Sequence, residues 1–204
     1  MKKFITTSPF QPDGRLEKKV YNAVDNSKLQ YNKPISFPIL SVINGYSQKG
    51  DNIEVITIKA DYINAENNYK KFKIELDELA QEKGFTYTLK TVDIPYTDEL
   101  DAQLETFQKL IDLTDDNDTL YACISYGSKP TPLIENLALN YAYRIKKNVS
   151  IECIVYGAID FNTKQANIYD ITSIFYMDEI VRVLAENKIA NPTEHIKALL
   201  NNEF

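Results

Sequence analysis

The sequence predicts an α/β fold: a doubly wound, mainly parallel, Rossmann-like sheet with helices on both faces. Apolar β-type runs alternate with helical periods along the chain, which is the pattern of βαβ units with right-handed crossovers. The chain has 204 residues, of which 44% are hydrophobic and 25% charged, an ordinary composition for one well-buried core. We therefore expect a single domain over residues 1–204.

Six apolar runs are predicted to be strands, the last of them shorter than the others. They are Lys3–Thr7, Ile53–Ala60, Phe85–Ile94, Thr119–Ser125, Ser150–Ile159 and Ala166–Ile171. The clearest helical period between them is Ala65–Lys83, where Tyr69, Phe72, Leu76 and Leu79 recur at spacings of three and four. Gly84 is expected to end that helix.

Two further amphipathic helices are predicted at Asp98–Leu113 and Pro132–Lys147. Their apolar stripes, which we expect to be buried, are Leu100, Leu104, Phe107 and Ile111 in the first and Leu133, Leu137, Tyr141 and Ile145 in the second. Met177–Asn187 and Pro192–Leu200 form a C-terminal pair, so about residues 1–175 hold the sheet and main helices and 176–204 the last helices. Before residue 50 the pattern is weaker, and we predict helices at Leu16–Val24 and Phe37–Tyr46.

Composition and missing motifs exclude several function classes. The net charge of −6 disfavours binding to duplex nucleic acid, and no stretch is apolar enough to suggest a signal peptide or membrane segment. Cys123 and Cys153 lie in apolar runs and are expected to be buried thiols of a cytoplasmic protein. The chain lacks G-x-G-x-x-G and P-loop motifs, its one histidine, His195, is expected at the surface, and the run 115–118 is interpreted as a solvated loop. No cofactor or metal is predicted.

The segment from Thr119 to Pro132 is the strongest candidate site. A buried strand runs into a loop with hydroxyls, Gly127 and Lys129, and then into a helix with Thr131 as N-cap and Pro132 at its first position. The first turn of a helix has unpaired N–H groups and a positive dipole end, and both stabilise an anion such as phosphate. Lys129 would add a mobile charge, and Gly127 permits a tight turn or close approach to a ligand.

Three segments are expected to converge beyond the carboxyl ends of the strands, where such sheets bind ligands. They are residues 6–10 after the first strand, 126–129 after the fourth, and 156–160 after the fifth.

The order of these pieces resembles the CARF (CRISPR-associated Rossmann fold) domain of type III CRISPR ancillary proteins, in its Csx2/TM1812-like branch. The resemblance covers most of the chain. It is carried by residues 4–9 (FITTSP), by 124–130 (ISYGSKP) with the helix that follows, and by 154–158 (IVYGA) with the strand 168–172 (IYDIT) and the helix after it. Ser125 and Tyr126 depart from the commoner family pattern of an acidic and a small polar residue.

The resemblance implies a homodimeric receptor for cyclic oligoadenylate, with cyclic tetra-adenylate as the expected ring. Ser8, Ser128 and Lys129 would hold phosphate and ribose, while Phe10, Tyr126 or Tyr156 would stack on adenine, unless these aromatics only pack in the core. The implied ligand-binding residues are Thr6, Thr7, Ser8, Pro9, Phe10, Ser125, Tyr126, Gly127, Ser128, Lys129, Thr131, Tyr156 and Gly157.

Family members normally carry an effector domain, and none is recognisable in this sequence. One alternative is therefore a stand-alone, metal-independent ring nuclease, in which Lys129 stabilises the phosphorane and Ser8 aligns the attacking 2′-hydroxyl. Another is an unrelated Rossmann-like module that binds a phosphorylated metabolite or serves assembly.

Overall fold

The computed structural model describes the backbone of every residue except 13, 161, 203 and 204, and the side chains of 200–202 are also left out of the description. The chain forms two compact units, Met1–Asp170 and Ile171–Phe204. The first holds the whole sheet. The second holds α5 (Thr172–Glu186) and α6 (Pro192–Asn202), where His195 is exposed as predicted.

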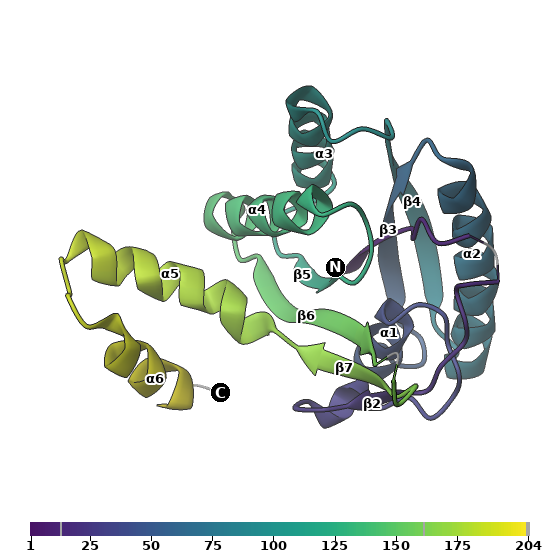
Figure 1. Ribbon diagram of the computed structural model, residues 1–204, viewed down its shortest axis with the longest axis horizontal. Helices are drawn as coiled ribbons and strands as arrows, with labels where there is room; N and C mark the ends of the chain where they lie inside the picture. Colours follow the sequence, from purple (N-terminus) through teal and green to yellow (C-terminus); the bar gives the residue numbers. More distant parts are fainter. Residues whose placement is uncertain (13, 161, 203–204) are drawn as a thin grey trace. The chain divides into compact units, whose positions relative to one another are not determined.

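The first unit is built on a seven-stranded sheet in the order β2-β7-β6-β5-β1-β3-β4 (Figure 1). Its strands are β1 (Lys2–Thr7), β2 (Tyr21–Ala23), β3 (Asn52–Ala60), β4 (Thr86–Ile94), β5 (Thr119–Cys123), β6 (Ser150–Ile159) and β7 (Ala166–Asp170). All neighbours are parallel except β6 and β7, which are antiparallel. This confirms the predicted α/β, Rossmann-like fold and its mainly parallel sheet.

The helix predicted at Leu16–Val24 is wrong. That segment holds the short strand β2, which pairs with the distant β7, and an isolated bridge between Lys19 and Ile35. A short strand that is defined by pairing with such a distant segment leaves no periodic pattern in its own sequence. The predicted Phe37–Tyr46 helix exists as α1 (Ile39–Tyr46), and a short 3-10 helix, η1 (Ser27–Leu29), precedes it.

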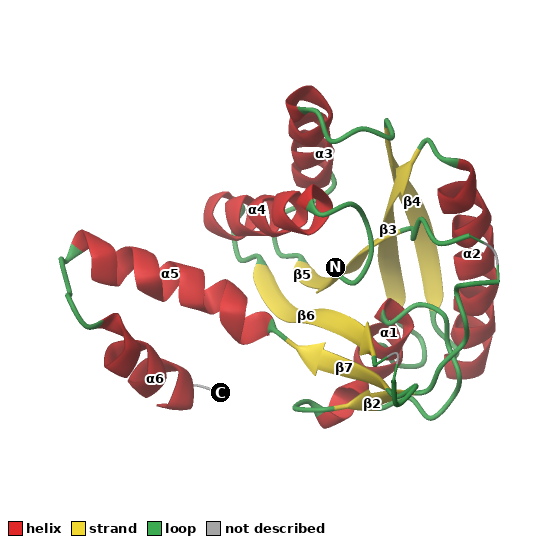
Figure 2. Ribbon diagram, viewed as in Figure 1, coloured by secondary structure: helices red, strands yellow, loops and turns green. Residues whose placement is uncertain are grey.

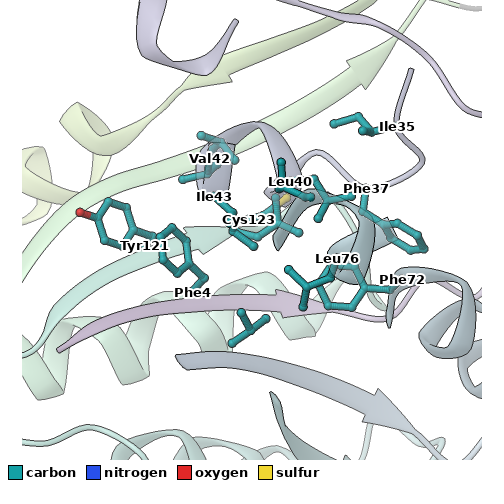
Figure 3. Close-up of a cluster of buried hydrophobic side chains, with 14 of the residues drawn as sticks. Phe4, Ile35, Phe37, Leu40, Val42, Ile43, Phe72, Leu76, Tyr121 and Cys123 are labelled. Atoms are coloured by element: carbon teal, nitrogen blue, oxygen red, sulfur yellow. The ribbon is translucent and has the colours of Figure 1, made fainter. Parts of the chain in front are cut away.

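Helices cover both faces of the sheet (Figure 2). On one face α1 and α2 (Ile63–Lys83) pack over a core that includes Phe4, Tyr121 and Cys123 of the strands (Figure 3). The predicted stripe of α2 is largely confirmed, since Phe72, Leu76 and Leu79 are buried; α2 ends at Gly84, whose φ of 75° is left-handed. The other face carries α3 (Leu100–Asp112) and α4 (Pro130–Ile145).

The apolar stripes predicted for α3 and α4 are mostly exposed rather than buried. Leu100, Leu104, Leu133, Leu137, Tyr141 and Ile145 are between 44% and 68% exposed, whereas Ile111 is buried and Phe107 half-buried. The buried residues of these helices are mainly small or polar: Ala102, Thr106, Leu110 and Ile111 in α3, and Thr131, Glu135, Ala138, Leu139, Asn140 and Ala142 in α4. Small side chains allow these helices to lie close to the strands. We call the six exposed side chains the α3/α4 face.

The acidic loop before β5 is solvated at residues 115–117, as predicted, but Asp118 at its end is buried. Asp118 is 2% exposed and accepts a 2.8 Å ion pair from Lys3 Nζ, which also reaches Asp115 at 2.8 Å and Glu54 at 3.5 Å. Burial opposes the charge on Lys3, but the hydrogen bonds to Asp115 and Asp118 raise its pKa above the usual value. The acidic run therefore fastens the amino end of β1.

Within the described residues, no group of histidine, cysteine and acidic side chains is arranged to hold a metal ion. The described helices likewise include none with both the length and the apolar character needed to cross a bilayer. Cys123 and Cys153 are buried thiols, as predicted.

Candidate ligand-binding site

The site lies where the chain order of the sheet reverses. From β1 the chain continues to β3 and β4 on one side, and it then returns to build β5 and β6 on the other. Parallel α/β sheets bind ligands at such a switch point, beyond the carboxyl ends of the strands. Thr6 of β1 pairs with Cys123 of β5, so the loops that follow the two strands leave the sheet at the same level (Figure 1).

The loop after β5 delivers the N-terminus of α4 to this point. Gly127 has a φ of 112°, and a Cβ there would lie 2.8 Å from Thr131 Cβ, so glycine is required for the tight turn. The helix begins at Pro130, with Lys129 in the N-cap position, so the predicted start at Pro132 and the predicted N-cap Thr131 are both wrong. Thr131 instead meets Ser128, with 3.1 Å between their hydroxyl oxygens.

Lys129 stands at the rim of the site with its charge unpaired. Its side chain is exposed, and no hydrogen bond or ion pair engages Nζ in the part of the chain that the structure describes. The first turn of α4 lies directly after it but does not offer the free N–H groups that were predicted, because Pro130 and Pro132 have none and the Thr131 N–H is donated to the Ser128 carbonyl at 3.1 Å. A mobile cation next to a helix N-terminus is suited to hold a phosphate.

The segment after β1 is more buried than a binding loop would be. The Ser8 hydroxyl donates a 2.6 Å hydrogen bond to the Ala65 carbonyl, and the Pro9 carbonyl accepts one from Asn68 at 2.8 Å. Thr6 and Thr7 are also buried, and the Thr7 hydroxyl has no partner within the described residues. The structure therefore directs Ser8 towards α2, while Phe10 reaches the surface of the sheet's carboxyl edge.

The third predicted segment is a continuation of β6 and not a loop. Gly157 donates its N–H to Ser125 Oγ at 2.7 Å, which joins the ends of β5 and β6. Gly157 is glycine because a Cβ there would lie 2.4 Å from Pro38 Cγ. Tyr156 is 45% exposed on the strand.

Tyr126 occupies the core rather than the open site. Its hydroxyl donates to the Ser36 carbonyl at 2.8 Å, and its ring makes an edge contact with Phe37 at 6.4 Å between centroids. Burial raises the pKa of Tyr126 well above its usual range. Of the three aromatics considered for stacking, Phe10 and Tyr156 remain accessible.

Glu135 is a buried acid that sequence reasoning missed. It is fully buried on the sheet side of α4, one turn after Thr131, and neither carboxylate oxygen has a partner among the described residues. Burial raises its pKa to about 8. Its carboxyl lies close enough to Cys123 to add to the effect of burial, which raises the pKa of that thiol to about 11. The spacing of Glu135 from Thr131, Ala138 and Leu139, by three or four residues, could have placed it on the buried face of α4.

A pocket of about 380 Å³ opens beside the α4 N-terminus; Phe10, Ser128 and Thr131 in its walls were predicted to bind ligand, but the other lining residues were missed. It is lined by Phe10, Ala60, Ile94, Pro95, Tyr96, Thr97, Asp98, Ala102, Gln103, Thr106, Ser128, Pro130, Thr131 and Ile134. The missed part follows β4, an edge strand from which no ligand loop was expected. The pocket shares Ser128 and Thr131 with the candidate phosphate site.

Two comparisons with known proteins bear on this site. No protein-family model matches the chain. Over 108 residues, 52% of the chain, it is 30% identical to the CRISPR-associated protein MJ1674 of Methanocaldococcus jannaschii. The matched region covers 17% of that protein's length.

Proposed function

We propose that this chain is a cytoplasmic, homodimeric sensor of cyclic oligoadenylate, with cyclic tetra-adenylate as its ring, in type III CRISPR antiviral defence. The observation that carries the proposal is the unpaired Lys129 beside the N-terminus of α4, at the switch point of the sheet. The partial similarity to a CRISPR-associated protein supports the biological setting. An effector domain or partner would turn binding into a response.

The phosphates of the ligand are assigned to the loop between β5 and α4. Lys129 supplies the full charge, the Ser128 hydroxyl supplies a directional donor, and the N-terminus of α4 adds the positive end of its dipole. The chain's net charge of −6 keeps long nucleic acids away, whereas a small polyanion needs only this local cationic rim.

The α3/α4 face supports the homodimer. It presents six large apolar side chains to solvent on two neighbouring helices, and an apolar patch of this kind is typical of an interaction surface. A second copy would bury the same patch about a two-fold axis. Because α4 starts in the ligand loop, an interface centred on its N-terminal half, at Leu133 and Leu137, would bring two such loops to one two-fold symmetric ring.

The hydrogen bond of Ser8 favours a sensor that binds the ring without cleaving it over a ring nuclease. The ring-nuclease alternative needs a hydroxyl free to align the attacking ribose oxygen, and the Ser8 hydroxyl is already donated to Ala65. Lys129 serves binding and cleavage equally, so product analysis has to separate the two.

The test is a calorimetric titration with cyclic tri-, tetra- and hexa-adenylate, without metal, followed by chromatography of the mixture. We expect cyclic tetra-adenylate to bind and to be recovered intact. Lys129→Ala should weaken binding by roughly tenfold to a hundredfold, because it removes a charge-assisted contact. Lys147→Ala, just beyond the other end of α4, is the matched control and should bind as the wild type does. Absence of binding to every ring would refute the proposal, and recovery of linear product would establish the nuclease instead.

A further inference from the structure

The pocket beside the α4 N-terminus has an aromatic wall. The Phe10 and Tyr96 rings meet edge to face at 5.3 Å between centroids, and Tyr62 stacks on Tyr96 at 4.5 Å. Tyr62 does not line the pocket, so it supports Tyr96 from behind. A ring held in this way offers a preformed flat surface to another planar group.

The polar side of the pocket offers acceptors. The Gln103 amide nitrogen donates to the Asp98 carbonyl at 2.6 Å, which fixes the amide orientation and leaves Oε1 as an open acceptor. The Asp98 carboxylate is exposed and forms no hydrogen bond or ion pair with any described residue. The Thr106 hydroxyl is already donated to the Ala102 carbonyl.

This chemistry differs from that of the neighbouring loop. Neither lysine nor arginine lines the pocket, and its carboxylate would repel a phosphate. A planar group that carries N–H donors fits both walls: its ring lies on Tyr96, and its donors meet Asp98 and Gln103. Adenine has such a donor in its exocyclic amine. Hypoxanthine presents a carbonyl oxygen at the same position, which would face the carboxylate.

We infer that this pocket binds an adenine base of the ligand, with Tyr96 as the stacking platform and with Asp98 and Gln103 as the residues that select the amine. The inference rests on the proposed function for the rest of the ligand. Ser128 and Thr131 line the pocket at its border with the phosphate loop, so a base and the phosphate attached to it would occupy adjoining sites.

The test uses mononucleotides, which do not depend on a dimer or on the whole ring. Adenosine and inosine monophosphate are titrated separately into the protein, and binding is followed through backbone amide NMR shifts. We expect the adenosine form to bind about tenfold or more tightly than the inosine form, since an unmatched hydrogen-bonding group is costly in a formed site. Asp98→Ala should reduce this preference to about threefold or less.

Two controls isolate the effect. Asp101→Ala removes the same charge from an exposed residue in the first turn of α3, outside the pocket lining, and should keep the preference. Tyr96→Ala should weaken both mononucleotides by about tenfold, whereas Tyr96→Phe, which keeps the ring, should not. Equal binding of the two nucleotides to the wild type, or an unchanged preference in Asp98→Ala, would overturn the inference.

The outcomes also separate this inference from the proposed function. If cyclic tetra-adenylate binds and neither Asp98→Ala nor Tyr96→Ala changes its affinity, the base pocket is wrong and the sensor stands. If no ring binds but the mononucleotide preference depends on Asp98, the pocket is right and the sensor is wrong.

Discussion

Glu135→Gln is the substitution that tests the buried acid of α4 most directly. The carboxyl is fully buried and has no partner among the described residues, and the main effect on its pKa is the loss of water. Glutamine keeps the size and shape of the side chain but cannot ionise. The two proteins should therefore differ in how their stability depends on pH.

The sign follows from the direction of the shift. Burial raises the pKa of Glu135 from 4.5 to about 8, so in this interval the folded protein holds a proton that the unfolded chain has released. The wild type therefore loses stability as the pH rises from 4.5 to about 8, by about 1.4 kcal/mol per pH unit and about 5 kcal/mol in all. The loss is complete above the folded pKa.

The assay is urea unfolding of both proteins at pH 5 and pH 7. Relative to the wild type, Glu135→Gln should gain about 3 kcal/mol of unfolding free energy between these two conditions. An unpaired glutamine amide costs about 1–3 kcal/mol, but that cost is independent of pH and cancels in the comparison. Glu152→Gln, an exposed position on β6, should show no such gain. Parallel pH profiles for the wild type and Glu135→Gln would refute the reasoning.

Three further variants test the ion pairs of Lys3, the α3/α4 face and the loop between β5 and α4. Lys3→Ala removes the buried cation from Asp118 and Glu54, which keep only the Met1 ammonium and Lys90 as partners, and should cost about 1.5–3 kcal/mol in urea unfolding. Lys33→Ala, at an exposed pair, should cost about 1 kcal/mol or less. If the chain forms the proposed homodimer, Leu133→Asp combined with Leu137→Asp should shift it to a monomer in sedimentation velocity, with little change in thermal midpoint. A dimer that persists in this variant would place the interface elsewhere. Gly127→Ala should weaken binding of cyclic tetra-adenylate in calorimetry, because alanine is strained at a φ of 112° and its Cβ would crowd Thr131; unchanged affinity would exclude that loop.

The strands could be predicted because buried parallel strands are marked by local composition, and six of the seven were found. The missing one, β2, is three residues long and is defined only by its pairing with β7. The spacing of apolar residues located α3 and α4, but most of the residues that it assigned to the core are exposed. An apolar stripe identifies one face of a helix, but it does not show whether that face packs against the sheet or lies on the outside. Inside, these helices need small side chains such as Ala102 and Ala138, which carry little hydrophobic signal.

The candidate site could be predicted only in part for a related reason. Chain order alone places the loops after β1 and β5 side by side, because their strands are neighbours at the switch point. Chain order does not show which hydroxyl groups are free to bind a ligand, and the Ser8 hydroxyl already donates a hydrogen bond to the Ala65 carbonyl. Nor does it reveal that Tyr96 and Asp98, which follow an edge strand, line a pocket with residues of the α4 N-terminus.

These observations give α4 three distinct surfaces with different chemistry. Its N-terminus borders the candidate site, its inner side holds Glu135, whose pKa burial raises to about 8, against the sheet, and its outer side is part of the α3/α4 face. A helix that only filled the core would bury Leu133 and Leu137 and would have no reason to bury an unpaired acid. In α4, Leu133 and Leu137 are exposed and Glu135 is buried, which is the opposite arrangement. This argues that α4 makes contacts at its N-terminus and on its outer side, and such a helix is suited to couple ligand binding to the association of two subunits.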